Sequence, residues 1–534
     1  MSRILGLALS AVTLLSLSAC GGGAGGNGGG GGGGGGPYTI GGTVTGLSGA
    51  KLTLMNNGAD TLTVTENGRF TFANPVSSGG KYNVTIDGEP LNPIQFCVAG
   101  DGSGTAEANV TSVQITCTTP SGKTLYSFGK PPDGSSPTGK LVFDGFGNLY
   151  GTTSGGGAYG SGTVFKLTPS QGQWAETVLY SFCPPQTVPC ADGAVPYAGV
   201  VFDSTGNLYG TTYLGGAYGN LLSGQNNGGV VFKLTPSGNG SWTETVLHSF
   251  GNGTDGSQPF AGVVFDKQGN LYGTTQFGGI NNIECPGGCG IVYELSPGVN
   301  GQWTESVIYE LCQQANCGDG FGPYAGVVFD PSGNLYGTAY NGGNSFLDGT
   351  VFELTPNGNG KWNETTLYQF QGGIADGANP QAGVVLDNAG NLYGTTQYGY
   401  APHSSSGFNN GIAFELVRGS AGKWTENLLY GFCLIGDVPD ACHSYSDFVL
   451  DKSGNLYGTA TDYSALGQGA VFSLTPGAAN SAWNEVPLYP FGGGPEGGNP
   501  SGAGGLIFDQ AGNLYGTTIR GGTNGNGVVF EVTP

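Results

Sequence analysis

The pentapeptide Asn-Leu-Tyr-Gly-Thr occurs seven times in this chain, and its recurrence limits what the chain can fold into. The copies begin at Asn148, Asn207, Asn270, Asn334, Asn391, Asn455 and Asn513. Successive copies are 57 to 64 residues apart. Each copy is therefore one supersecondary unit that must stack on its neighbours to bury a core. Units of several short strands at this period predict a β-propeller before any other repeat architecture.

One copy, residues 261–311, shows four strand-forming runs. The continuous apolar run Ala261–Asp266 predicts an inner strand buried on both faces. Leu271–Thr275, Gly290–Leu295 and Trp303–Leu311 follow it as three further strands. Four strands make one blade, so the seven copies predict a seven-bladed propeller.

The outer strand is present one time fewer than the other three strands. Its Trp-x-Glu motif begins at Trp174, Trp242, Trp303, Trp362, Trp424 and Trp483. The chain stops after the third strand of the last copy, whereas Thr124–Phe128, ahead of the first copy, matches the end of an outer strand. We therefore expect Thr124–Phe128 to complete the last blade, which closes the ring and removes two exposed sheet edges.

Residues 37–118 form a different segment of alternating strand-like runs. Asn-Gly pairs at 57–58 and 67–68 lie between these runs and indicate hairpin turns. The pattern resembles the immunoglobulin-like or prealbumin-like domains of bacterial surface proteins and suggests a spacer. The expected fold is thus all-β: a small β-sandwich at 37–118, followed by a seven-bladed β-propeller at 119–534.

The repeats also resemble a known family over residues 124–534. The matching motifs are Asp-Gly-x-x-Pro, Ala-Gly-Val-Val-Phe-Asp, Gly-Asn-Leu-Tyr-Gly-Thr-Thr and Gly-Thr-Val-Phe. They are similar to the choice-of-anchor, or GloVer-type, tandem repeats of bacterial surface proteins. The resemblance implies a surface protein for which a lipid anchor is one mode of attachment, and it implies no established activity.

The first twenty residues have the pattern of an export signal. Arg3 precedes an apolar run from Ile4 to Leu17, which is short for a membrane span. The run ends in Leu-Ser-Ala-Cys20, which resembles a bacterial lipobox, so residues 1–20 are interpreted as a lipoprotein signal peptide with lipidation at Cys20. An ordinary secretory signal, cleaved at a small residue, is the alternative.

Residues 21–36 contain fourteen glycines and are interpreted as a flexible tether of roughly 20–25 Å. The residue after Cys20 is Gly21, not the Asp of the inner-membrane retention signal. We therefore expect an exported protein that is lipid-anchored in the envelope, at the outer membrane or cell surface.

Ten further cysteines form five local pairs. The pairs are Cys97/Cys117, Cys183/Cys190, Cys285/Cys289, Cys312/Cys317 and Cys433/Cys442. An exported protein folds in an oxidising compartment, so disulfides are expected. Metal binding is the alternative, but the spacings are irregular and the chain has only three histidines.

The predicted loops divide into a uniform face and a variable face. The uniform face has near-identical Asp-x-x-Gly-Asn turns, which begin at Asp144, Asp203, Asp266, Asp330, Asp387, Asp451 and Asp509. The other face has loops of variable length that carry the four cysteine pairs of the repeats. A scaffold that varies one face places its function there.

Aromatic residues gather in the variable loops and are the candidate binding residues. They are Tyr159, Tyr213, Tyr218, Phe277, Tyr340, Phe346, Tyr398, Tyr400 and Tyr463. Flat rings in shallow sites suit sugar rings or the central contacts of a protein interface. The alternative is that the rings only cap neighbouring blades.

Acidic residues at matching positions before the inner strands are the second candidate set. They are Asp133, Asp192, Asp255, Asp319, Asp376, Asp440 and Glu496. They are expected to circle the channel mouth, where they could hold Ca²⁺, although turn formation by Asp-Gly is the simpler interpretation. Asp447 stands where other copies have the inner-strand glycine, and it adds a carboxylate near the channel.

The net charge and the motifs of the chain argue against several classes of partner and activity. A net charge of −21 disfavours nucleic acids and anionic membrane surfaces as partners. His248, His403 and His443 are scattered, and no nucleophile, zinc or phosphate-loop motif occurs. We expect no cofactor, no resident metal and no catalysis, and membrane contact only through the lipid anchor.

The leading hypothesis is a surface module that binds a polysaccharide, or an envelope or extracellular protein. A scaffold in an envelope complex is the first alternative. An enzyme acting on a polysaccharide or a lactone, with Asp447 in a deep polar channel, is the second.

Overall fold

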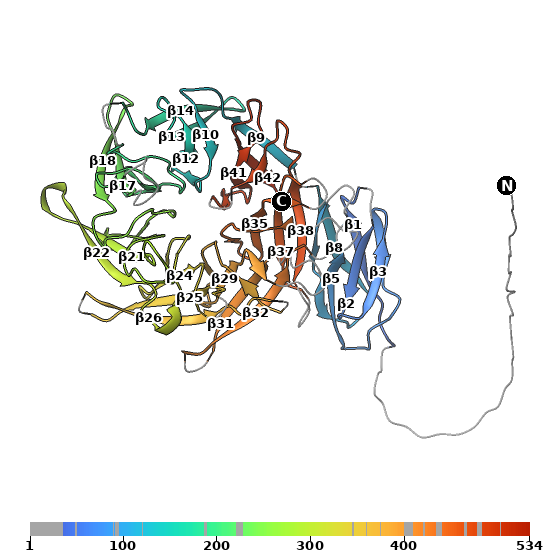
Figure 1. The fold of residues 1–534 in the computed structure, drawn as a ribbon. Coiled ribbons are helices and arrows are strands. Elements are labelled where there is room, and N and C mark those ends of the chain that lie inside the picture. The colour runs from blue at the N-terminus through green and yellow to red at the C-terminus, as the bar shows by residue number, and fades with distance from the viewer. Residues whose placement is uncertain are drawn as a thin grey trace, which may run out of the picture.

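The computed structural model describes residues 36–534, except for 49–50, 89, 91–94, 120, 186–189, 220–227, 344–346, 359, 374, 400–409, 420–421, 434–440, 464–466, 478–482 and 502–503 (Figure 1). The predicted signal peptide, Cys20 and the glycine-rich segment up to residue 35 lie outside this part. The described chain is all-β, with two short 3-10 turns, at Val299–Gly301 and Ala315–Cys317. None of its helices has the length and apolar character needed to cross a membrane.

The N-terminal segment folds into two four-stranded sheets that share one core. The first sheet has the order β4 (Gly68–Thr71), β1 (Ile40–Thr45), β8 (Val110–Thr118), β6 (Phe96–Gly100). The second has the order β3 (Asp60–Val64), β2 (Leu52–Asn56), β5 (Lys81–Gly88), β7 (Ser103–Thr105). Ile40, Leu52 and Val113 are fully buried between the sheets, and Cys97 and Cys117 are directly opposite residues of β6 and β8 joined by a disulfide.

Seven further sheets follow in the described residues, one for each sequence copy. In each, an inner strand of two residues is followed by three longer antiparallel strands. The first two sheets contain β11 (Val142–Phe143), β12 (Leu149–Gly156), β13 (Thr163–Ser170) and β14 (Gln173–Ser181), then β15 (Val201–Phe202), β16 (Leu208–Thr212), β17 (Val230–Pro236) and β18 (Trp242–Ser249). The next two contain β19 (Val264–Phe265), β20 (Leu271–Thr275), β21 (Ile291–Pro297) and β22 (Trp303–Glu310), then β23 (Val328–Phe329), β24 (Leu335–Ala339), β25 (Thr350–Pro356) and β26 (Trp362–Gln369).

The last three sheets repeat this order. They contain β28 (Val385–Leu386), β29 (Leu392–Thr395), β31 (Ile412–Arg418) and β32 (Trp424–Gly431), then β34 (Val449–Leu450), β35 (Leu456–Ala460), β37 (Ala470–Thr475) and β38 (Asn484–Pro490), then β40 (Ile507–Phe508), β41 (Leu514–Arg520), β42 (Val528–Thr533) and β9 (Ser121–Ser127). Short strands add to this pattern: β10 (Gly134–Pro137) on β12, β39 (Gly498–Pro500) on β41, β27 (Gly377–Ala378) on β30 (Tyr398–Gly399), and β33 (Ala441–Cys442) on β36 (Asp462–Tyr463).

The seventh sheet joins the two ends of the repeat region. Strand β9 pairs with β42 from Ser127 opposite Val528 to Ser121 opposite Thr533, which confirms the expected contribution of Thr124–Phe128. Figure 1 shows the seven sheets following one another around a common centre, with β9 beside β41 and β42. Strands β10 and β14 of the first sheet contact β41 and β9 of the seventh.

The glycine of Leu-Tyr-Gly-Thr makes room for an aromatic ring of the neighbouring strand. Gly210 in β16 faces Phe232 in β17, and a Cβ on Gly210 would lie 2.7 Å from the ring. Phe232 is fully buried, and its ring meets that of Phe182, from the preceding sheet, edge to face at 5.1 Å. The repeated pentapeptide thus encodes the packing of one sheet on the next.

The Asp-x-x-Gly-Asn motif forms the turn between the two inner strands of every sheet. In the second sheet, Asp203 accepts hydrogen bonds from the amides of Thr205 and Asn207, from the Asn207 side chain and from the Tyr209 hydroxyl. Burial opposes ionisation of Asp203, but the hydrogen bonds from Asn207 and Thr205 outweigh it and hold its pKa at about 2. Asp203 is therefore an ionised part of its turn.

The inner strand is shorter than the sequence predicts, and its residues are not buried on both faces. Val264 and Phe265 alone form β19, and both are half-buried. The residues before them turn toward the neighbouring sheet. The carbonyl oxygen of Ala261 accepts a hydrogen bond of 2.8 Å from the Thr211 hydroxyl of the preceding sheet, and a Cβ on Gly199 would clash with the carbonyl of Lys140.

The pairing of β9 with β42, which joins the two ends of the repeat region, can be tested by mutation. Phe128 directly follows β9, is fully buried and packs edge to face on Phe165 at 5.2 Å. Phe128→Ala should lower the free energy of unfolding by about 3–5 kcal/mol because it leaves a cavity at the junction of the first and last sheets. Chemical denaturation should show this loss, whereas Phe146→Ala, at a side chain that is 91% exposed, should stay within about 0.5 kcal/mol of the parent. Equal stability of the two variants would contradict closure through β9.

Candidate functional site

Two sets of loops lie together on one face of the seven sheets. The loop that enters a sheet pairs with the loop between the second and third strands of that sheet. Ala194 pairs with Leu214 in this way, Ser257 with Phe277, and Phe321 with Asn341. Strands β27 and β30, and β33 and β36, make the same contact in the fifth and sixth sheets. The expectation that these loops share a face is confirmed.

Five aromatic rings form a continuous arc on this face. We call Tyr213, Tyr197, Phe260, Tyr324 and Tyr340 the aromatic arc. Tyr197 stacks on Phe260 with ring centroids 5.0 Å apart, and Tyr213 packs against both rings. Phe260 contacts Tyr324 at 5.6 Å, and Tyr324 contacts Tyr340 at 5.0 Å. Each ring is half-buried, so one side remains accessible.

Glutamine side chains fix the outer tyrosines of the arc. The Tyr213 hydroxyl donates to Gln276 at 3.2 Å, and the Tyr340 hydroxyl donates to Gln397 at 2.6 Å. Each glutamine belongs to the sheet after that of its tyrosine. Burial, with a smaller contribution from neighbouring tyrosines, raises the pKa of Tyr213 to about 12. Its hydroxyl therefore stays protonated and remains a donor.

A cavity of about 410 Å³ lies at the centre of the seven sheets, and the inner segments of all seven line it. Phe260 and Tyr324 belong to both the arc and the cavity wall, and Tyr445 continues the aromatic lining in the sixth sheet. Asp447 also lines the cavity, and its carboxylate accepts a hydrogen bond of 2.8 Å from the Gly383 amide. The arc and the cavity are therefore one continuous site.

The structure brings together only part of the predicted aromatic set. Tyr213 and Tyr340 lie in the arc. Tyr159, Tyr218 and Tyr398 are 47%, 50% and 40% exposed. Phe277 is half-buried where its loop pairs with Ser257. Phe346, Tyr400 and the side chain of Tyr463 lie outside the described part.

Sequence reasoning missed four aromatic residues that line the cavity or complete the arc: Tyr197, Phe260, Tyr324 and Tyr445. The available pattern was Pro-aromatic-Ala-Gly directly before an inner strand, as at 196–199, 259–262 and 323–326. These aromatics precede an apolar run, so they were not separated from the predicted strand core.

None of the described acidic residues before the inner strands is among the residues that line the central cavity. Asp192 accepts hydrogen bonds from the Tyr180 hydroxyl at 2.9 Å and the Cys183 amide at 3.0 Å, so it ties an outer strand to its following loop. Asp133, Asp319 and Asp376 bind Tyr126, Tyr309 and Tyr368 in the same way.

The remaining acids of this set lie in corresponding loops. Asp255 accepts from the amides of Gly251 and Asn252 and lies 3.2 Å from His248, which replaces the outer-strand tyrosine. Glu496 lies beside Gly492, and Asp440 is outside the described residues. Among the residues that the structure describes, these acids do not come together in threes.

Five of these aspartates each face a glutamate of the Trp-x-Glu motif in the following sheet: Asp133, Asp192, Asp255, Asp319 and Asp376. Burial, together with the charge of Asp192, raises the pKa of Glu244 to about 8. Glu176 beside Asp133 is raised to about 8 by the same causes, and Glu426 beside Asp376 to about 7. The outer strands therefore carry carboxyl groups that titrate near neutral pH.

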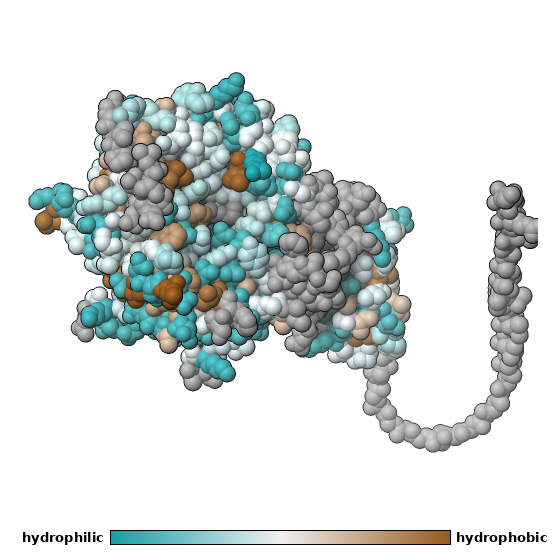
Figure 2. Space-filling model, viewed as in Figure 1, coloured by the Kyte–Doolittle hydropathy of each residue, from teal (hydrophilic) through white to brown (hydrophobic). Residues whose placement is uncertain are grey.

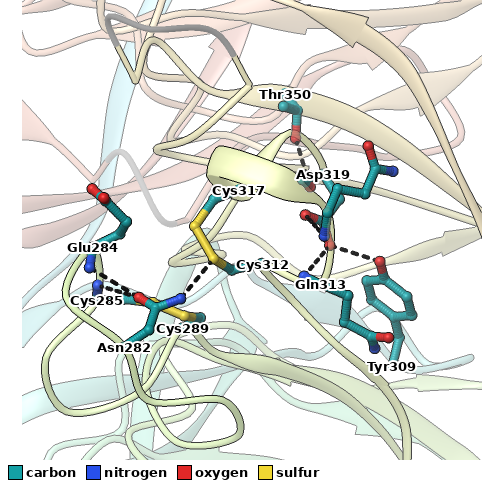
Figure 3. Close-up of a disulfide and its surroundings, with 11 residues drawn as sticks. Asn282, Glu284, Cys285, Cys289, Tyr309, Cys312, Gln313, Cys317, Asp319 and Thr350 are labelled. Carbon is teal, nitrogen blue, oxygen red and sulfur yellow. Dashed lines mark hydrogen bonds between the residues drawn. A yellow bond between two sulfur atoms is a disulfide. The ribbon is translucent and has the colours of Figure 1, made fainter.

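All five predicted cysteine pairs are disulfides in the structure. Cys285–Cys289 and Cys312–Cys317 lie side by side between the third and fourth sheets (Figure 3). The sulfur atoms of Cys285, Cys312 and Cys317 are within 4.8 Å of one another, and Asn282 donates to the Cys312 sulfur at 3.1 Å. These bonds hold the loops of the variable face close to the sheets.

The Cys183–Cys190 disulfide shows that the variable loops are anchored below the surface. The sequence places this pair in a surface loop, but Cys190 is buried, with 3% of its surface exposed. Its carbonyl oxygen accepts hydrogen bonds of 2.9 Å from the amides of Gly193 and Gly216. Cys190 therefore joins the loop that enters the second sheet to the loop between β16 and β17. It is a structural residue and not part of an exposed binding surface, and Cys442, also buried and bonded to Cys433, corresponds to it in the sixth sheet.

The surface seen in Figure 2 is mainly hydrophilic, and hydrophobic residues appear only in small groups. This agrees with a chain in which charged residues are few but polar loops cover the sheets.

Comparison with known proteins gives a family and two distant structural neighbours. The profile described as the Gloeobacter/Verrucomicrobia repeat matches residues 100–282 and 218–433. No curated protein matches the chain. A structure from Thermus thermophilus, described as an oxidoreductase (glucose dehydrogenase), aligns at 12% identity over 78% of this chain and 100% of its own, with a TM-score of 0.34. PorZ, an essential bacterial surface component of the type-IX secretion system of Porphyromonas gingivalis, aligns at 12% identity over 91% of this chain and 61% of its own, with a TM-score of 0.40.

The raised glutamate pKa values predict how stability depends on pH. A carboxyl group with a raised pKa binds more protons in the folded than in the unfolded state between about pH 4.3 and its folded pKa. The stability it provides is complete below that window and is lost as the pH rises through about 8 for Glu244. The thermal midpoint should therefore be higher at pH 5 than at pH 8.5, and Glu244→Gln should reduce the difference. Glu66→Gln, at an exposed site in the N-terminal sandwich, is the control and should leave the difference between the two thermal midpoints unchanged.

Proposed function

The chain belongs to the Gloeobacter/Verrucomicrobia repeat family, and on that premise we propose that it is an exported cell-surface protein whose seven-bladed β-propeller binds glycans. The binding site is the aromatic arc together with the central cavity. The small sandwich at 37–118 is a spacer, and the propeller occupies 119–534.

The propeller assignment is supported by the connectivity of the sheets. Each sequence copy gives one antiparallel sheet, and outer strands contact one another in sequence from β9 through β14, β18, β22 and β26 to β32. The seventh sheet contains a strand from each end of the repeat region. One cavity is lined by inner segments of all seven sheets, as expected for blades around an axis.

The aromatic arc is the observation that carries the glycan proposal. Its rings are half-exposed, contact one another at 5.0 to 5.8 Å, and border a cavity. The apolar faces of sugar rings stack on such surfaces, while tyrosine hydroxyls and glutamine amides exchange hydrogen bonds with sugar hydroxyls. A cavity of about 410 Å³ falls in the range of small-ligand sites.

Export is supported by the disulfides and the N-terminal sequence. Five disulfides indicate an oxidising compartment. The lipobox-like Leu-Ser-Ala-Cys20 and the glycine-rich residues after it suggest a lipid anchor with a tether, which would present the propeller away from the membrane.

Glycan binding is tested with the purified protein against a panel of bacterial and plant polysaccharides. Phe260→Ala removes the ring that contacts Tyr197, Tyr213 and Tyr324, and should weaken binding about tenfold through lost stacking. Phe146→Ala, in a turn of the uniform face, should leave affinity unchanged. Chelation of Ca²⁺ should also have no effect. Absence of saturable binding across the panel, or equal affinity of both variants, would contradict the proposal.

The lipid anchor is tested separately in cells. Cys20→Ser should abolish incorporation of labelled fatty acid and move the protein from the membrane fraction to the soluble fraction. If the variant stays membrane-bound, the anchor is not at Cys20.

A further inference from the structure

Small residues dominate one position around the central cavity. It is occupied in chain order by Lys140, Gly199, Gly262, Gly326, Gly383, Asp447 and Gly505. The backbones are close at this level, because a Cβ on Gly326 would lie 3.3 Å from the Gly262 carbonyl, and one on Gly262 would lie 3.5 Å from the Gly199 carbonyl. We call these seven residues the inner ring.

Two members of the inner ring, Lys140 and Asp447, carry long or charged side chains. Both line the cavity, and they are the charged side chains among the residues that line it. They belong to the first and sixth sheets, so the seventh sheet separates them. Gly199, Gly262, Gly326 and Gly383 leave bare backbone in the cavity wall, and Lys140 and Asp447 add opposite charges to it.

The two charged groups have unused binding capacity. Asp447 uses one oxygen, Oδ1, to accept from the Gly383 amide, and this contact fixes the carboxylate against the wall. Within the described chain, its other oxygen has no hydrogen-bond partner, and the Lys140 ammonium has neither a hydrogen bond nor a salt bridge. Both residues are half-buried. A charge in this setting is stabilised by a ligand that supplies a partner.

The remaining lining defines the shape of that ligand. Phe260, Tyr324 and Tyr445 supply aromatic rings, while Val142, Val201 and their equivalents supply apolar side chains. The space accommodates a small ring system that has an apolar face, hydroxyl groups and one negative charge. The acids counted in the net charge of −21 lie mostly in the turns, loops and outer strands described above, so they do not cancel Lys140 locally.

We propose that the cavity binds the terminal sugar of an acidic glycan end-on, as a uronic acid. The sugar carboxylate pairs with the Lys140 ammonium, and the free oxygen of Asp447 accepts hydrogen bonds from sugar hydroxyls. The ring stacks on the aromatic wall, and the following sugars run over the aromatic arc. This assignment rests on the proposed glycan function and names its ligand class.

The test compares uronate hexasaccharides with their uncharged methyl esters by calorimetry on the purified protein. Hexamers of galacturonate, glucuronate and mannuronate are the probes. The parent should bind at least one uronate more tightly than its ester, and Lys140→Met should lower that affinity at least tenfold while sparing the ester. Lys130→Met, at an exposed lysine in the loop that enters the same sheet, is the matched control and should change neither. Asp447→Asn should weaken acid and ester alike.

End-on binding is tested with uronate chains of 6 and about 60 residues. One protein per chain at both lengths is expected, whereas several proteins on the longer chain would overturn the end-on mode. Equal affinity of the parent for acid and ester, or of Lys140→Met and Lys130→Met for the acid, would overturn the role of Lys140. If the protein binds neutral glycans through Phe260 but does not bind uronates, this inference is overturned and the proposed function stands. If it binds no glycan, both are overturned.

Discussion

The close packing of seven inner segments around one centre is the constraint on which the rest of the structure depends. Backbone approaches backbone there, so the position in contact is glycine in five of seven sheets. Threonine hydroxyls from the neighbouring sheets satisfy carbonyls that no strand ladder reaches, as Thr211 does for Ala261. Short inner strands, a narrow cavity and a wall that is mostly bare backbone all follow from this geometry.

The sequence predicts the outer parts of each sheet well because their patterns are local. Leu271–Thr275 was expected as a strand and is β20, and the disulfides and the closing strand were also predicted. The inner strand was predicted too long because its apolar residues contact neighbouring sheets, and no local pattern distinguishes that contact from a ladder. Only two of the five rings of the aromatic arc, Tyr213 and Tyr340, are predicted from the sequence. The reason is the same: Tyr197 and Phe260 come from different copies and meet only after folding.

The acidic residues show how the surroundings of a carboxyl group determine its pKa. The Asp203 carboxylate accepts five hydrogen bonds in its turn, and its pKa falls to about 2. Glu244 is half-buried next to Asp192, and its pKa rises to about 8. Most of the negative charge therefore belongs to the architecture. The sequence places both residues in repeated motifs, but burial and neighbours decide which of them titrates near neutrality.

The seventh sheet combines β9, from the start of the repeat region, with β40, β41 and β42 from its end, so it can form only late in synthesis. Ser127 and Thr523 are hydrogen-bonded but lie 396 residues apart, so β9 leaves the ribosome long before its partner exists. The cavity wall includes residues of the first sheet and Ile507 of the last, so it cannot be complete until the last sheet has been made. A chain that stopped before β42 would leave β9 without its partner strand and the seventh sheet incomplete.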